Sequence, residues 1–190
     1  MNRKDFIQRA ALFGGTAMVL PVGILQSCEY TAKLRTTISD ADIPLFDEIG
    51  ETILPVTPES PGAKEAKIGA YMVLMINDCF VKEDQDIVLN GLNILDNYCA
   101  KQYNDSFKNL TAEQKLNVME GLQEEATALA LEQEGAEEPV LHYFDHLKRL
   151  TISGYFSSEI GMTIAREYLP VPGKYVADFP YKKGDKVWAM

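Results

Sequence analysis

Apolar residues recur at helical spacing along most of this chain. The clearest case lies between residues 68 and 79, where apolar side chains fall at i, i+3, i+4, i+7, i+8 and i+11: Ile68, Tyr71, Met72, Met75, Ile76 and Cys79. A continuous apolar stripe at this spacing is typical of an amphipathic helix that packs one face into a core. We therefore expect a helix over residues 68–79.

Capping and breaking residues set the bounds of the neighbouring helices. Ser39 or Asp42 caps a first helix, and Pro55 ends it because proline cannot continue the backbone hydrogen bonds. Thr111 and Gln114 form the capping box of a later helix. For these two helices and a third from about residue 84, the side chains expected to be buried are Phe46, Ile49, Ile53, Leu54, Ile87, Val88, Leu92, Leu95, Tyr98, Leu116, Met119, Leu122, Ala126 and Leu129.

The C-terminal third is less regular. Pro139 is placed to begin a fifth helix after Gly135 ends the fourth, and this helix should bury Val140, Tyr143, Phe144, Leu147 and Leu150. Ser157 or Ser158 caps a short sixth helix that ends near residue 168, and prolines beyond it favour an extended chain. No stretch shows strand alternation. The sequence thus predicts an all-α fold: a small helical bundle of about five or six helices (39–168) with an extended, irregular C-terminal arm (169–190).

The N-terminus is typical of an export signal over residues 1–27. A charged start precedes an apolar stretch, from Ala10 to Leu25, that is too short and interrupted for a permanent membrane helix. The start is similar to a twin-arginine signal with Lys4 at the second arginine, so that route and general secretion both remain open. The sequence from Leu25 to Cys28 resembles a bacterial lipobox, which predicts lipidation of Cys28, a tether over residues 28–38, and a lipid-anchored protein at the periplasmic face of a membrane.

The net charge excludes one class of partner, and the positions of the cysteines disfavour a disulfide. The net charge is −10, and beyond residue 27 the chain carries 15 basic and 27 acidic side chains, a net charge of −12. Such a surface repels a phosphate backbone, so we expect no nucleic-acid partner. Cys79 and Cys99 fall on consecutive predicted helices with an offset of roughly 20 Å. Buried free thiols are therefore favoured, and a disulfide is the weaker alternative.

Candidate catalytic residues are few. His142 and His146 have the i, i+4 spacing of a zinc helix, but Tyr143 stands where a His-Glu-x-x-His protease has its glutamate. They are weak candidates for metal ligands. The favoured alternative is that both histidines are partly exposed on the flank of a helix and bind no metal. An acidic cluster (Glu124, Glu125, Glu132, Glu134, Glu137, Glu138) is interpreted as a solvated surface. Ser153, Ser157 and Ser158 lack an evident base, so no catalytic residue is predicted.

Aromatic residues near the C-terminus indicate a protein-binding surface instead. An extended, proline-rich arm buries little against itself, and aromatic side chains are common interface anchors. Tyr155 and Phe156 fit a core corner as well as an interface. The predicted partner interface comprises Tyr155, Phe156, Glu159, Pro170, Pro172, Gly173, Tyr175 and Trp188.

Several of these motifs together resemble one family. They are the Arg3–Phe6 signal, the helix end at Glu51–Pro55, the Pro61–Lys64 loop, the Phe107–Leu110 turn leading into Thr111, and above all Lys148–Gly161 followed by Tyr168–Tyr175. The chain is similar to the gluconate 2-dehydrogenase subunit 3 family.

The resemblance implies a small, non-catalytic subunit that itself carries no cofactor. It would assist the folding, export and anchoring of a large FAD-dependent sugar or sugar-acid dehydrogenase, and a c-type cytochrome is a candidate for a further partner. The alternative is a free-standing exported lipoprotein that binds a ligand or metal ion through the helix of His142 and His146.

Overall fold

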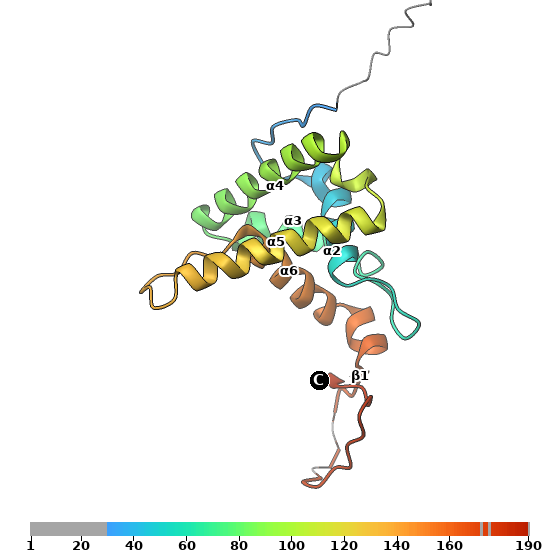
Figure 1. Cartoon of the computed structure of the whole chain (residues 1–190). Coiled ribbons are helices and arrows are strands. Elements are labelled where there is room, and N and C mark those ends of the chain that lie inside the picture. The colour runs from blue at the N-terminus through green and yellow to red at the C-terminus, as the bar shows by residue number, and fades with distance from the viewer. Residues whose placement is uncertain (1–29, 172, 175, 190) are drawn as a thin grey trace, which may run out of the picture.

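The protein is an all-α bundle, as predicted. A computed structural model describes residues 30–171, 173–174 and 176–189. Their α-helices are α2 (Ile43–Ile53), α3 (Ile68–Cys79), α4 (Lys82–Tyr103), α5 (Ala112–Glu132) and α6 (Tyr143–Ser157) (Figure 1). The shorter elements are η1 (Asp40–Asp42), η2 (Phe107–Asn109), the π-helical turn η3 (Gly161–Ala165), and the strands β1 (Glu167–Tyr168) and β2 (Trp188–Ala189).

Helix α6 is the centre of the bundle, because it contacts α2, α3, α4 and α5. Its spacing of apolar residues explains this position, since side chains on most of its circumference are buried. The largest fully buried side chains of the core are Phe46, Phe107, Leu45, Ile49, Ile68, Met72, Ile76, Leu92, Leu95, Leu147, Val88 and Thr151. The predicted stripe on α3 therefore faces the core over most of its length.

Two glycines bring α6 close to its neighbours. A Cβ atom on Gly91 of α4 would lie 2.1 Å from Cγ of Tyr143, and one on Gly154 of α6 would lie 2.5 Å from Cδ1 of both Ile68 and Tyr71. Contacts under 3 Å exceed what packed side chains tolerate without displacement. The helices therefore pack at these distances only because both positions lack a side chain.

The predicted helix ends are largely confirmed. Helix α3 has the predicted bounds, and α2 ends at Ile53, two residues before Pro55. The capping box of α5 is formed: the backbone N–H of Gln114 donates to Oγ1 of Thr111 (3.3 Å), and the N–H of Thr111 donates to Oε1 of Gln114 (3.0 Å). Helix α4 begins at Lys82, two residues earlier than expected.

The predicted start of the fifth helix at Pro139 is wrong, because α6 begins at Tyr143. The side-chain amide of Gln133 donates to the carbonyl of Val140 (3.0 Å) and its oxygen accepts from the N–H of Val140 (2.6 Å). This pair of hydrogen bonds holds the connection as a loop. Val140, predicted to be buried, is 57% exposed as a result.

Three further side chains predicted to be buried are exposed: Tyr98, Leu116 and Cys79. Helices α4 and α5 both pack on α6 but make few contacts with each other. A hollow of about 90 Å³ remains between them, and Tyr98 lines it. Cys79 is the last residue of α3. Cys79 and Cys99 are both free, as favoured from the sequence, but of these two thiols only Cys99 is buried.

The chain after α6 departs from the prediction in two ways. The last helical turn ends at Ala165 instead of near residue 168, and short strands follow where none was expected. The N–H of Glu167 donates to the carbonyl of Val187 (3.0 Å), and the N–H of Leu169 donates to that of Ala189 (2.9 Å). Two residues are too few to show alternation in a sequence. Ser158 does cap the turn, accepting at Oγ from the N–H of Gly161 (3.0 Å).

Among the residues that the structure describes, no helix is long and apolar enough to cross a membrane.

Candidate functional site

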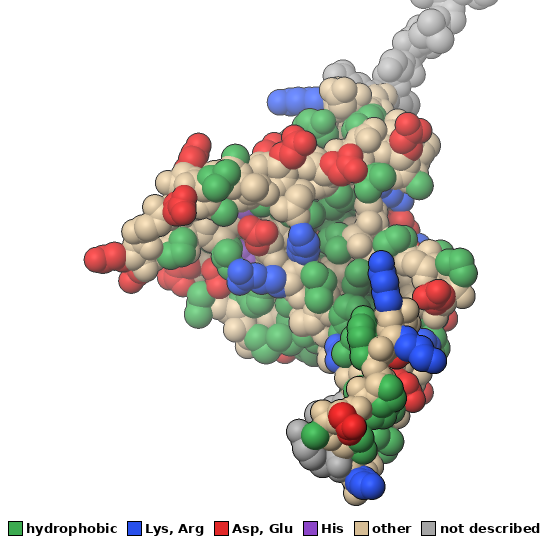
Figure 2. All heavy atoms as spheres, turned by 60° about the horizontal axis from the view of Figure 1, so that its bottom comes forward, with side chains coloured by type: hydrophobic (Ala, Val, Ile, Leu, Met, Phe, Trp, Pro, Cys, Tyr) green, Lys and Arg blue, Asp and Glu red, His purple; other side chains and the backbone are tan. Residues whose placement is uncertain are grey.

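The C-terminal arm projects from the helical bundle and exposes a set of apolar side chains. It extends from the end of η3 at the lower end of the molecule (Figure 1). Figure 2 shows hydrophobic side chains along this projection, interspersed with lysines and acidic residues. The exposed apolar residues of the arm and of the strand leading into it are Tyr168, Val171, Val176, Phe179, Tyr181, Val187 and Trp188. An exposed group of this kind is typical of a surface that another protein covers.

The base of the arm is held to the bundle by several contacts. Strands β1 and β2 bring its two ends together. The guanidinium of Arg166 donates to the carbonyl of Phe156 (3.2 Å) and lies 4.8 Å from the centre of the Phe156 ring. The ammonium of Lys186 donates to the carbonyl of Ile164 (2.5 Å). The arm therefore leaves the bundle at a defined place.

One aromatic pair lies within the arm. The rings of Phe179 and Trp188 meet edge to face at a centroid distance of 5.9 Å. Trp188 nevertheless keeps 42% of its surface exposed. Phe179 and Tyr181 belong, with Trp188, to the aromatic stretch that led us to expect a partner surface on the arm, and both are exposed.

The predicted interface residues divide into four groups. Pro170, Gly173, Trp188 and Glu159 are exposed, and Phe156 is half-buried under Arg166. Pro172 and Tyr175 lie outside the described residues. Tyr155 belongs to the core: it is 4% exposed, and its hydroxyl donates to the carbonyl of Pro61 (2.5 Å) and lies within hydrogen-bonding distance of the Ser60 hydroxyl. Of the two alternatives for Tyr155, the structure selects the core corner.

A hollow of about 580 Å³ lies beside the base of the arm. The loop of residues 56–62 forms most of its wall, and Ile164 of η3 completes it. Glu51 fixes this loop, because its carboxylate accepts from the N–H groups of Val56 (3.1 Å) and Lys64 (2.9 Å). The sequence predicted a loop here from its prolines but gave no indication of the hollow.

The two histidines lie near acidic residues of two different helices. His142 is the cap of α6, and its Nδ1 accepts from the N–H of Phe144 (3.3 Å). The Nε2 atom of His142 lies 3.9 Å from Glu125, whereas that of His146 lies 3.7 Å from Asp84 on a different helix. Within the described part of the chain, no group of three or more His, Cys, Asp or Glu side chains is placed to hold a metal ion.

His146 is buried, contrary to the expectation of two partly exposed histidines. Its Nε2 atom has no hydrogen-bond partner among the described residues, and its ring lies 5.3 Å from that of Phe80. Burial lowers the pKa of His146, the charge of Arg149 acts in the same direction, and the carboxylates of Asp84 and Asp145 oppose the shift. His146 is therefore a neutral core residue near neutral pH.

The other candidate groups are structural. The hydroxyls of Ser153, Ser157 and Ser158 donate to carbonyls of their own helix. The six glutamates of the acidic cluster are all exposed to solvent. Burial raises the pKa of the Cys99 thiol to about 12, with a further contribution from the charge of Asp96, so this thiol stays protonated.

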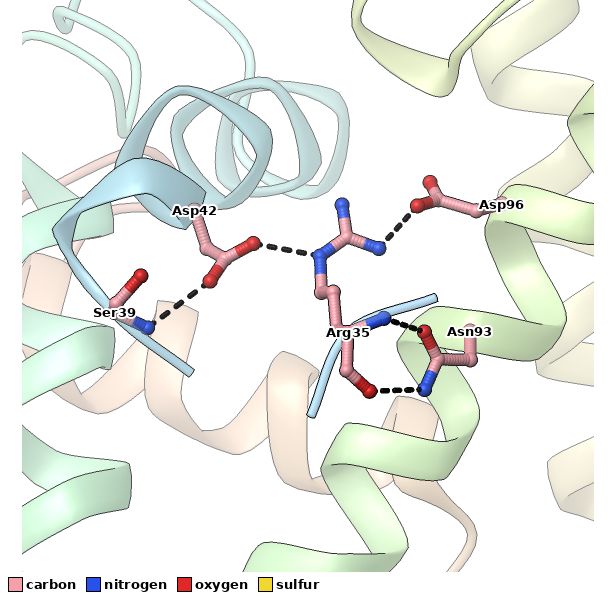
Figure 3. A network of polar contacts seen from close by, with 5 residues as sticks. All are labelled: Arg35, Ser39, Asp42, Asn93 and Asp96. Carbon is pink, nitrogen blue, oxygen red and sulfur yellow. Dashed lines mark hydrogen bonds and ion pairs between the residues drawn. The ribbon is translucent and has the colours of Figure 1, made fainter. Parts of the chain in front are cut away.

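A buried ion-pair network lies at the other end of the molecule from the arm. Arg35 donates from Nε to Asp42 (2.6 Å) and from Nη1 to Asp96, and its backbone exchanges two hydrogen bonds with the amide of Asn93 (2.8 and 3.0 Å) (Figure 3). We call this group the Arg35 clamp. Burial alone would lower the pKa of Arg35, but the hydrogen bonds and charges of Asp42 and Asp96 outweigh it and raise the pKa. Arg35 therefore stays protonated in the clamp.

The Arg35 clamp corrects the prediction of a tether over residues 28–38. Within the N-terminal segment (residues 30–38), the N–H of Tyr30 donates to Oδ1 of Asn104 (2.7 Å), and Ile38 belongs to the hydrophobic core. The amide of Asn77 donates to the carbonyl of Ile38 (3.2 Å). The N-terminal segment is thus part of the folded body. A single arginine in a short stretch without helical periodicity gives no signal of this in the sequence.

These features together define a small helical protein with an exposed apolar arm, and they include no constellation of catalytic groups among the described residues. The family model for gluconate 2-dehydrogenase subunit 3 matches residues 40–173, which extends from η1 into the arm. The chain belongs to this family, and the resemblance predicted from the sequence is confirmed. No curated protein and no solved structure matches the sequence.

Membership in this family indicates that the chain is an accessory subunit of a dehydrogenase complex and that it associates with a larger subunit. The N-terminal segment and the distal part of the arm lie outside the matched residues.

Proposed function

We propose that this protein is the non-catalytic small subunit of a membrane-associated, FAD-dependent sugar or sugar-acid dehydrogenase. Its C-terminal arm binds the large flavoprotein subunit, which carries the FAD, and a c-type cytochrome is a further partner of the complex. Family membership supports the association with a larger dehydrogenase subunit.

The exposed apolar side chains of the arm are the observation that carries the proposal. Tyr181 and Val171 are 77% and 76% exposed, so neither contributes much to the stability of the isolated chain. Large aromatic and aliphatic side chains lose this exposure only when another surface covers them. The mixture of lysines and acidic residues around them suits the polar rim of such an interface (Figure 2).

The proposal extends to folding, export and anchoring of the large subunit. The signal over residues 1–27 would direct export, and lipidation of Cys28 would hold the complex at the periplasmic face of a membrane. Support for these two steps comes from sequence motifs that lie outside the described residues. Twin-arginine export carries folded proteins, so a tightly bound flavoprotein without its own signal would travel with this chain.

Co-expression of the flavoprotein with and without this chain tests the accessory role. We expect soluble, FAD-loaded, exported flavoprotein only in the presence of this chain. The proposal fails if the flavoprotein folds, reaches the periplasm and oxidises its substrate equally well alone.

Surface variants test the role of the arm. The double variant Val171→Ser/Tyr181→Ser should weaken co-purification of the flavoprotein, since interface anchors contribute about 1–2 kcal/mol each. Leu131→Ser is the matched control, because Leu131 is 65% exposed at the far end of α5. Equal loss of binding in both variants, or in neither, would contradict an interface on the arm.

A further inference from the structure

The N-terminal segment is attached to the bundle at both of its ends and in its middle. It is attached at its first described residue, where the N–H of Tyr30 donates to Asn104 just beyond the end of α4. The Arg35 clamp holds its middle, and Ile38 holds its end in the core. Each attachment restricts the chain, so the point where it leaves the body is fixed beside the end of α4.

This attachment limits how far the body lies from a lipid on Cys28. Only Glu29 lies between Cys28 and Tyr30, and an extended chain spans at most about 7 Å over these two residue steps. The hydrocarbon of a lipid-modified cysteine is buried in the bilayer. The end of α4 and the neighbouring η2 are therefore held at the level of the lipid headgroups.

The surface at this end of the molecule is suited to headgroups. We define the N-terminal pole as Tyr30, Lys33, Leu34, Lys101 and Lys108. Tyr30, Lys33, Leu34 and Lys108 line one hollow of about 430 Å³, and Lys101 lies in the last turn of α4. Leu34 is 71% exposed, and the three lysines are exposed as well. An exposed aliphatic side chain among lysines favours an anionic lipid surface, although the chain as a whole is acidic.

The C-terminal arm lies at the opposite end of the molecule. The N-terminal segment lies at the top of Figure 1, and the arm extends from the bottom. We infer that the lipid-modified protein binds the bilayer through its N-terminal pole, with the Arg35 clamp fixing its orientation, and presents the arm on the side away from the membrane. This inference rests on the proposed lipidation of Cys28.

Energy transfer to a lipid-headgroup acceptor tests the orientation. The full lipid-modified chain, with Cys79→Ser, is placed in vesicles of phosphatidylethanolamine and phosphatidylglycerol. A donor dye is attached at Gln102→Cys, an exposed position near the end of α4 that is not part of the N-terminal pole, in one sample and at Lys183→Cys, in the arm, in another. We expect several-fold stronger quenching of the donor at position 102. Equal quenching at the two positions overturns the inference.

A lengthened connection provides the matched variant. Twelve Gly/Ser residues inserted between positions 29 and 30 leave the Arg35 clamp intact but add a reach of roughly 20 Å. We expect the difference in quenching between positions 102 and 183 to become several-fold smaller. An unchanged difference would show that the short connection does not set the orientation, and would overturn the inference.

Flotation separates this result from the proposed anchoring role. Native protein that floats with vesicles while Cys28→Ser does not establishes the anchor, whatever the dyes report. If the native protein fails to float, both the proposed anchoring role and this inference are refuted.

Discussion

Removal of the Arg35 charge should destabilise the fold strongly. The side chains of Asp42 and Asp96 are only 9% and 6% exposed, so Arg35→Met leaves two carboxylates in a poorly hydrated site while keeping the aliphatic stem. Breaking a buried ion pair costs about 3–5 kcal/mol, and an exposed pair contributes under about 1 kcal/mol. Arg35 is 19% exposed, and Asp42 keeps a hydrogen bond from the N–H of Ser39. We therefore expect a loss of about 2–4 kcal/mol.

Urea unfolding followed by circular dichroism measures this loss. With a urea dependence of about 2 kcal/mol per molar, the midpoint of Arg35→Met should fall by about 1–2 M. Lys82→Met is the control, because its ion pair with Asp86 is exposed at both side chains and should change stability by less than about 0.5 kcal/mol.

A second substitution identifies the cause of the loss. In Arg35→Met/Asp96→Asn the buried charge of residue 96 is replaced by a neutral amide, so part of the lost stability should return. The reasoning is refuted if Arg35→Met costs less than about 1 kcal/mol, or if the double variant is less stable than the single one. Either result would mean that water hydrates these carboxylates in the folded protein.

Three further predictions concern the core and the thiols. Because burial lowers the pKa of His146 below its ordinary value of 6.5, the unfolded chain binds its proton more readily, and the free energy of unfolding should fall as the pH drops below 6.5; urea titrations of His146→Gln should lack this component, and an unchanged pH slope would contradict it. Gly154→Ala should cost about 1–3 kcal/mol through the overlap described above, whereas Gly121→Ala on α5, which meets nothing within 4 Å, should be neutral or stabilising by up to about 1 kcal/mol; thermal unfolding that ranks them in the opposite order would refute the packing argument. In the chain without residues 1–28, a thiol reagent should modify Cys79 at once and Cys99 only after unfolding, because Cys99 is buried; rapid labelling of both would contradict its burial.

Much of the helical architecture could be predicted because local signals agreed with the tertiary packing. The stripe on α3 and the capping box at Thr111 each depend on residues close in sequence, so their outcome did not depend on distant partners. The start of α6 could not be predicted in this way. Two hydrogen bonds between Gln133 and Val140, which are seven residues apart, hold residue 140 in a loop. They outweigh the tendency of Pro139 to begin a helix.

Features that depend on distant contacts were missed. The N-terminal segment resembles a polar linker until Arg35 is placed between Asp42 and Asp96, and Asp96 lies 61 residues away. Tyr155 has an aromatic side chain suited to an interface, but its hydroxyl contacts Pro61 across 94 residues. The exposed residues of the arm were easier to predict, because proline-rich sequence excludes the regular packing that would bury them.

The parallel pairing of β1 with β2 has a consequence for recognition. Because Glu167 lies opposite Trp188, residues 169–187 form a closed loop instead of a free tail. By the usual chain statistics, bringing the two ends of such a loop together costs about 2–3 kcal/mol of conformational entropy. The chain loses this conformational entropy when it folds, before any partner binds. Binding of the loop by a partner subunit would therefore lose less free energy to ordering than binding of an unpaired tail of the same composition.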